Sequence, residues 1–240
     1  MSVNPYKNSQ KGKKQQVEDM FDNISGKYDI LNHILSLNLD KTWRSKAISC
    51  LNNLQVSSLL DVATGTGDMV KAALKLKPSR IVGIDLSEGM LYGARKKFPS
   101  EIDGTKISFL KGDSENLPFN DNEFDAETVA FGVRNFENTL KGLSEMYRVL
   151  KPCGKVVVLE FSKPASFPFR NIYLFYFKKL LPLIGRIVSK DKEAYTYLPQ
   201  SVSSFPERED FIGIMKSAGF RECSFRTLTF GVVSIYTGIK

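Results

Sequence analysis

Cysteine and histidine are scarce in this 240-residue chain, and their scarcity excludes two kinds of site. The three cysteines, Cys50, Cys153 and Cys223, lie far apart and form no Cys-x-x-Cys pair. This pattern argues against a disulfide framework or a zinc centre. With His33 as the only histidine, a histidine-rich metal site is excluded as well, and we expect no metal. Unpaired cysteines fit a reducing compartment, so we expect a cytoplasmic protein.

Long apolar runs, linkers and repeats are also missing. No stretch of 18 apolar residues occurs, so no transmembrane helix is expected. The first residues lack the apolar core of a signal peptide. There is no internal repeat and no linker rich in glycine, proline or serine. The hydrophobic content of 42% suits a single α/β domain over residues 1–240.

Acidic residues are outnumbered, with 26 Asp and Glu against 34 Lys and Arg, so the net charge is +8. Such an excess favours anionic partners, and charge alone does not choose between nucleic acid and phospholipid head groups. We see no RNA-binding module, and expect a membrane surface rather than nucleic acid. Residues 1–16 are interpreted as a mobile basic tail. The tail's cations are Lys7, Lys11, Lys13 and Lys14.

Helical periodicity covers residues 17–54, where apolar residues recur at spacings of three and four. We expect two helices here, as a cap over a ligand site. Short apolar runs then alternate with helical patterns, which is typical of a parallel sheet with helices on both faces. The expected strands are Ser58–Val62, Arg80–Asp85, Ile107–Lys111, Phe124–Phe131, Lys155–Phe161, Phe220–Leu228 and Val232–Ile239. The expected helices are Asp68–Leu76, Glu88–Phe98, Thr139–Leu150 and Glu207–Ala218.

The order of these elements predicts an α/β fold of the Rossmann-like kind, with a mostly parallel seven-stranded sheet. The last two strands are joined by a tight link at Gly231. They are expected to form an antiparallel hairpin on the sheet edge.

Residues 59–68, LLDVATGTGD, carry the most informative pattern. An apolar strand runs into Gly65-x-Gly67, and a helix starts directly after it. The glycines allow a tight turn and close approach of a ligand, and the helix N-terminus offers free amide groups. A dinucleotide site would want a third glycine where Val70 stands. Asp61, just before the turn, suits a cationic sulfonium better than a pyrophosphate, so we favour S-adenosylmethionine over NAD.

Two further acids stand at strand ends. Asp85 follows Gly65 by 20 residues, the spacing expected for an acid that binds ribose hydroxyls. Asp113 follows the third strand and can accept a hydrogen bond from the adenine amino group. Because the carboxyl ends of parallel strands meet at one sheet edge, Asp61, Asp85 and Asp113 are expected to share a site. Each acid alone could be only a turn or cap residue.

The chain resembles the ubiquinone/menaquinone biosynthesis C-methyltransferases over nearly its whole length. Four stretches carry the resemblance: residues 21–32 (FDNISGKYDILN), the glycine turn with its trailing Asp68, residues 130–135 (AFGVRN), and residues 146–152 (MYRVLKP) running on to 159–164 (LEFSKP). The glycine turn alone indicates only a methyltransferase, and the others are more specific. The resemblance implies methylation of a ring carbon of demethylmenaquinol, of a related benzoquinol, or of both.

Two positions depart from the family pattern. Ala130 stands where serine is often found, so a hydrogen bond from that hydroxyl to the cofactor is absent. Thr64 replaces a more usual glycine but leaves the Gly-x-Gly turn in place. The resemblance implies cofactor contacts at Thr66, Asp85, Asp113 and Ser114, and the turn adds Asp61, Gly65 and Gly67.

A ring carbon becomes a good nucleophile only when the neighbouring hydroxyl loses its proton, so the enzyme must stabilise a phenolate or take its proton. Arg134 could stabilise the phenolate or pair structurally with an acid, and Asn135 could hold a hydroxyl or a water. The base is left open, since a lone histidine is more often structural than catalytic. The candidates are Tyr28, Asp29 and His33 in the cap and Glu160 at the tip of the fifth strand.

Residues 164–198 interrupt the alternation of strands and helices. One helical face here is apolar and is accompanied by positive charge. Such a helix can lie on an anionic bilayer and admit a polyprenyl chain, which would make the protein peripherally membrane-associated. It could also be a core helix or the face of a homodimer. The apolar face comprises Tyr173, Tyr176, Phe177, Leu180, Leu181 and Ile184, and further apolar surface comes from Phe167, Phe169 and Phe175. The positive charge comes from Arg170, Lys178, Lys179 and Arg186. We expect two tyrosines at the mouth of the pocket, Tyr195 and Tyr197.

Three alternatives stay open beside a quinol methyltransferase. One is a methyltransferase for another small phenolic or lipid substrate. Another is a binding factor without activity, against which the intact acids Asp85 and Asp113 argue. The last is an NAD-dependent oxidoreductase, which Val70 and Asp61 weaken.

Overall fold

The computed structural model describes residues 3–6, 8–175 and 192–240, with only the backbone for a few of them. Eight strands form one sheet in the order β3-β4-β2-β1-β5-β6-β8-β7. They are β1 (Ser58–Val62), β2 (Arg80–Asp85), β3 (Glu101–Ile102), β4 (Thr105–Lys111), β5 (Phe124–Ala130), β6 (Leu150–Phe161), β7 (Arg221–Leu228) and β8 (Val233–Ile239).

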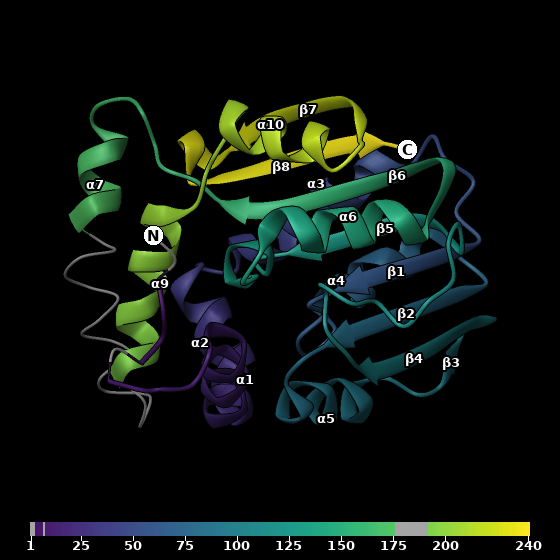
Figure 1. The fold of residues 1–240 in the computed structure, drawn as a ribbon, viewed down its shortest axis with the longest axis horizontal. Coiled ribbons are helices and arrows are strands. Elements are labelled where there is room, and N and C mark those ends of the chain that lie inside the picture. The colour runs from purple at the N-terminus through teal and green to yellow at the C-terminus, as the bar shows by residue number, and fades with distance from the viewer. Residues whose placement is uncertain (1–2, 7, 176–191) are drawn as a thin grey trace.

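Strands β4, β2, β1, β5 and β6 are parallel neighbours. The chain runs outward from β1 in one direction and then from β5 in the other. Ligands bind at such a reversal, beyond the carboxyl ends of the strands. In Figure 1 the arrowheads of the parallel strands point to the left, toward the helices that gather on that side.

Helices cover both faces of the sheet. On one face α3 (Leu39–Ile48), α4 (Asp68–Ala73) and α5 (Glu88–Lys97) pack into one apolar core. On the other, α6 (Thr139–Val149) and α10 (Glu209–Ser217) pack into a second. The central strands are buried on both faces, and this explains why they read as continuous apolar runs.

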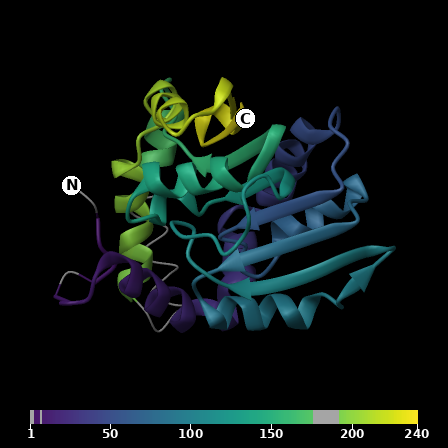
Figure 2. The ribbon, with the colours of Figure 1, turned by 45° about the vertical axis from the view of Figure 1, so that its right-hand side comes forward.

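Among the described residues, four helices lie beyond the carboxyl edge of the sheet: α1 (Lys13–Ile24), α2 (Tyr28–Leu35), α7 (Phe169–Phe175) and α9 (Lys192–Ser204). Figure 2 shows α1 beside α5, which it contacts. Among the described residues no helix is long and apolar enough to span a membrane.

The α/β fold with its antiparallel C-terminal hairpin is confirmed, with differences in detail. The sheet has eight strands rather than seven, because the two-residue β3 pairs antiparallel with β4. A segment of two residues is too short to show a strand pattern. Strand β6 begins at Leu150 rather than Lys155, since its pairing with β5 continues across a register shift.

The N-terminal cap also differs from expectation. It contains three α-helices rather than two, because a 3-10 turn at Ser25–Lys27 separates α1 from α2. Left-handed backbone at Leu37 (φ 52°) and Asn38 (φ 59°) then ends α2 before α3 begins. The expected tail is shorter than residues 1–16, since α1 already starts at Lys13, whose buried ammonium donates to the Phe136 carbonyl over 2.7 Å.

Candidate active site

The glycine turn after β1 has the conformation that its residues predict. Gly65 (φ 56°) and Gly67 (φ 84°) are both left-handed, a region that glycine enters without strain. A Cβ on Gly67 would lie 2.7 Å from the Phe98 ring. The Gly65 N–H donates to Asp85 Oδ2 over 2.8 Å, so the turn is tied directly to the tip of β2.

A first cavity lies beyond the tips of β1, β2, β4 and β5. Its enclosed space of about 70 Å³ is narrow because α1 lies over it. Lys14 of α1 lines this cavity and pairs with Asp113 at 2.6 Å and Glu115 at 3.5 Å. Six residues expected at the site line it: Tyr28, Gly65, Asp85, Asp113, Ser114 and Asn135.

Asp61, Thr66 and Gly67 do not line this cavity. Asp61 is 1% exposed and accepts hydrogen bonds from Thr64 (2.6 Å) and Thr128 (2.7 Å), so its carboxylate lies beneath the turn, and its expected contact with the cofactor stays a prediction. Thr64, which replaces the more usual glycine, thus holds that carboxylate. Burial raises the pKa of Asp61 to about 6 and that of Asp85 to about 6.

A second cavity of about 450 Å³ lies beside the first. Tyr28, Phe21 and Phe131 line both cavities, so the two share a wall. The second cavity is mainly apolar and is enclosed by residues of α1, α2, α3, α7, α9 and the 3-10 turn Thr229–Gly231. Phe131 and Phe161 lie side by side in its lining, with ring centroids 4.6 Å apart.

Arg134 and Asn135 stand together on the 3-10 turn Val133–Asn135 but face different cavities. Arg134 lines the second cavity and donates to Glu160 Oε1 over 2.8 Å, so it is both paired with an acid and exposed to the cavity. Asn135 lines the first cavity and accepts a hydrogen bond from Tyr197. Tyr197 lines the second cavity, as expected, whereas the side chain of Tyr195 lies outside the described residues.

Three of the candidate bases do not line either cavity, which argues against them. Glu160 is fully buried, and its two oxygens accept from Arg134 and from the Phe161 N–H. Asp29 accepts from the Thr66 hydroxyl and pairs with Lys97. The fourth candidate, Tyr28, lines both cavities, but burial raises the pKa of its phenol and keeps it protonated.

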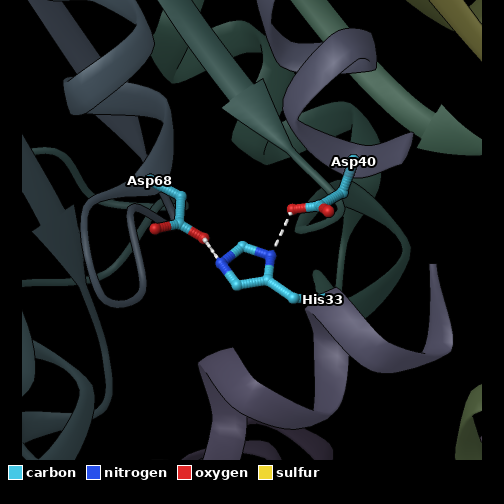
Figure 3. Close-up of side chains that lie close together, drawn as sticks. All are labelled: His33, Asp40 and Asp68. Atoms are coloured by element: carbon cyan, nitrogen blue, oxygen red, sulfur yellow. Dashed lines mark hydrogen bonds and ion pairs between the residues drawn. The ribbon is translucent and has the colours of Figure 1, made fainter. Parts of the chain in front are cut away.

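His33 is the remaining candidate base that lines neither cavity. Its ring lies between two carboxylates. Figure 3 shows the imidazole between the two carboxylates, and its Nδ1 is 3.0 Å from Asp40 and its Nε2 is 4.0 Å from Asp68. The ligand atoms of the three residues lie within 4.8 Å of one another, a spacing that a metal ion could use. However, Arg44 lies 2.5 Å from Asp40, and Lys97 lies 3.2 Å from Asp68. These cations already balance both carboxylates, so we interpret the cluster as a hydrogen-bond network.

Sequence reasoning missed Arg44, which lines the second cavity from α3 with Trp43. Its pairing with Asp40 follows the i, i+4 spacing of a helical ion pair. That spacing was a usable signal, although surface pairs with the same spacing are common. In the segment 164–198, Phe169 and Tyr173 line the second cavity, and residues 176–191 lie outside the described residues.

Comparison with known proteins decides the family. A model of the ubiE/COQ5 methyltransferase family matches residues 9–240. A demethylmenaquinone methyltransferase of Bacteroides fragilis is 48% identical over 239 residues, covering 99% of this chain and 97% of the relative. The chain belongs to the ubiE/COQ5 methyltransferase family.

Further comparisons agree with membership of the ubiE/COQ5 methyltransferase family. A ubiquinone/menaquinone biosynthesis C-methyltransferase of Geobacter sulfurreducens is 45% identical, covering 99% of this chain and 93% of the relative. The fold matches an S-adenosylmethionine-dependent methyltransferase from Thermotoga maritima, with a TM-score of 0.66, 22% identity, and coverage of 92% and 99%. The chain is therefore an S-adenosylmethionine-dependent methyltransferase.

The first cavity of this ubiE/COQ5 methyltransferase holds the strand-tip carboxylates expected of an S-adenosylmethionine site. Both Asp85 and Asp113 stand at strand tips and line the cavity, and their expected contacts with the ribose hydroxyls and the adenine amino group stay predictions. Ala130 and Gly132 also line it and leave room beside β5. Lys14 pairs with Asp113 in this structure, so a ligand that binds the Asp113 carboxylate would compete with Lys14.

Proposed function

We propose that the enzyme methylates a ring carbon of demethylmenaquinol to form menaquinol. The relatives support this assignment, since the protein from Bacteroides fragilis is named a demethylmenaquinone methyltransferase. The observation that carries the proposal is the second cavity. It is apolar, measures about 450 Å³ and shares Tyr28 and Phe131 with the first cavity, where we expect the cofactor. A ring held there lies beside the cofactor, and a prenyl chain has apolar surface to occupy.

In this proposal the first cavity holds the methyl donor, and the second cavity holds and activates the quinol ring. When bound, S-adenosylmethionine supplies an electrophilic methyl group and leaves as S-adenosylhomocysteine. Arg134, whose guanidinium is held by Glu160, lies beside the ring, and its N–H groups can donate to the phenolate oxygen and so favour the phenolate over the phenol. Phe131 and Phe161 offer faces against which an aromatic ring can stack. The apolar lining keeps water from the reacting carbon.

A membrane contact belongs to this proposal. Leu37 (80% exposed) and Phe230 (66% exposed) line the second cavity and also face outward. In α7 and just before it, Phe175 and Phe167 are exposed as well. An apolar rim around the opening lets the enzyme rest on a bilayer while a prenyl chain passes into the cavity.

The deciding assay follows label from methyl-labelled S-adenosylmethionine into reduced demethylmenaquinol in detergent. We expect labelled menaquinol from the wild type and none from Asp85→Ala. A benzoquinol with the same prenyl chain serves as the second acceptor. Label in neither acceptor, with cofactor binding intact, would overturn the substrate assignment, and label in benzoquinol alone would correct the head group.

Vesicle sedimentation tests the membrane contact. With vesicles of phosphatidylglycerol and phosphatidylethanolamine we expect the wild type to sediment and Leu37→Asp with Phe230→Asp to stay in the supernatant. Tyr92→Asp is the matched control, because Tyr92 is also an exposed hydrophobic residue (58%) but does not line either cavity. Equal sedimentation of all three proteins would contradict this rim.

A further inference from the structure

Two buried arginines line the second cavity, and each is only partly satisfied. The side chains of Arg44 and Arg134 are 9% and 7% exposed. Arg44 pairs with Asp40 at 2.5 Å, and Arg134 pairs with Glu160 at 2.8 Å. In both, the buried Nε–H has no acceptor among the described residues. A buried donor on a charged group is costly to leave unpaired, so each guanidinium has donor capacity that its carboxylate partner does not use.

Both guanidinium groups lie along the same aromatic wall. Arg44 Cζ lies 5.4 Å from the centroid of the Phe131 ring, and Arg134 Cζ lies 5.6 Å from that of Phe161. These two rings are neighbours, with centroids 4.6 Å apart. The two charges also act together on Tyr28, since each favours the ionised form of its phenol. A phenol bound beside Tyr28 would lie in the field of both arginines.

The side chain of Arg44 is held in position by a network of hydrogen bonds and ion pairs. Its partner Asp40 also accepts from Ser36 over 2.7 Å and lies 3.0 Å from His33 Nδ1. His33 is in turn 4.0 Å from Asp68, and Arg44 is 3.8 Å from the same carboxylate. This network joins α2, α3 and α4, so the guanidinium is held in place before a ligand arrives.

We propose that Arg44 is a second substrate-binding residue, which binds one quinol oxygen while Arg134 binds the other. The inference rests on the proposed function and makes it more specific: the cavity selects a ring with two ionisable oxygens over a ring with one. His33 and Asp40 act as positioning residues through Arg44, which gives His33 a role that does not require contact with the substrate.

The test compares two acceptors under anaerobic, reducing conditions: a prenylated 1,4-naphthoquinol and its monomethyl ether, in which one oxygen no longer ionises. For Arg44→Met we expect the KM for the quinol to rise at least tenfold, while the ether is affected less than threefold and the Kd for S-adenosylmethionine changes less than twofold. Arg80→Met is the matched control, since Arg80 also pairs with a carboxylate (Glu123, 3.0 Å) and lies over a phenylalanine, but does not line either cavity.

If Arg44→Met does not fold, Arg44→Lys replaces it, because lysine keeps the charge beside Asp40 but lacks the Nε–H donor. Equal losses with quinol and ether, or no rise in KM, would overturn the role of Arg44 while leaving quinol methylation intact. Calorimetric binding of both acceptors to the enzyme loaded with S-adenosylhomocysteine is independent of turnover. The wild type could transfer no label and still bind the quinol more tightly than the ether, with Arg44→Met abolishing this difference. That outcome would overturn the proposed function and leave the role of Arg44 standing.

Discussion

Tyr197 donates a hydrogen bond of 3.1 Å to Asn135 Oδ1 and so links the two cavities. Tyr197 lines the second cavity and Asn135 the first, and both are at least nine-tenths buried. The bond joins α9 to the turn that also carries Arg134. A change at Tyr197 should therefore be felt at both cavities.

Tyr197→Phe removes this donor and leaves Asn135 Oδ1 without its partner. We expect the free energy of unfolding to fall by about 1–3 kcal/mol and the kcat to fall several-fold, with a smaller change in cofactor affinity. Chemical unfolding and steady-state kinetics measure the two effects. Tyr92→Phe, at an exposed tyrosine, is the control. Unchanged stability and kcat in Tyr197→Phe would show that the bond matters little.

Arg134→Met should separate catalysis from stability. Loss of the charge is expected to lower kcat by about 10²–10³ at an unchanged Kd for S-adenosylmethionine. It should also destabilise the fold by about 3–5 kcal/mol, because Glu160 is left buried and unpaired. In the double variant Arg134→Met, Glu160→Gln we expect stability to recover and activity not to recover. Recovery of both would mean that Arg134 only supports the structure.

Asp61 should give an unusual pH dependence of stability. Burial raises its pKa to about 6, above the value of about 3.9 in an unfolded chain. The folded state then binds more protons than the unfolded state between these values, so Asp61 makes the protein more stable as pH falls from 6 to 4. Relative to Asp61→Asn, we expect the wild type to gain up to ~3 kcal/mol in urea unfolding between pH 7 and 4.

Asp125→Asn is the control for that titration. Its bonds to Lys151, Ser57 and Ser58 lower the pKa of Asp125, so its stabilisation is lost only below the unfolded value. The difference between wild type and Asp125→Asn should stay flat from pH 7 to 4. A flat difference for Asp61→Asn as well would contradict the raised pKa.

Lys14→Ala should speed the entry of the cofactor. The Lys14 ammonium is 2.6 Å from the carboxylate of Asp113 that adenine is expected to use. Without it, we expect both association and dissociation of S-adenosylmethionine to become several-fold faster, as surface plasmon resonance can measure. Lys11→Ala, on a lysine that pairs with Asp19 at 2.6 Å and does not line the cavity, should leave both rates unchanged. The same acceleration in both variants would point to a general effect of charge.

The sequence was sufficient for the order of the elements and for most of the cofactor cavity. Strand ends and glycine turns are local features, so Gly65, Asp85 and Asp113 could be placed together from topology alone. The start of β6 could not be placed, because pairing with β5 extends it past a proline and a glycine. Strand β3 exists only through its pairing with β4.

The second cavity was harder to predict, because its walls come from distant segments. Arg44 and Phe230 are brought together only when the cap and the C-terminal hairpin meet around the cavity. Whether Glu160 can act as a base also depends on a partner, since its carboxylate at the strand tip is paired with Arg134. A lone side chain in a sequence does not show whether its charge is already neutralised.

Trp43, the chain's only tryptophan, lines the second cavity and stands edge-on to Phe131 and Phe161, with centroids 6.2 Å and 6.4 Å away. Its indole N–H donates to Thr229 over 2.7 Å, which fixes the ring. The protein therefore carries its single tryptophan fluorophore at this cavity. The fluorescence of Trp43 can report the binding of an aromatic ligand without any label. An oxidised quinone, which accepts electrons, should quench this fluorescence more than the reduced quinol does.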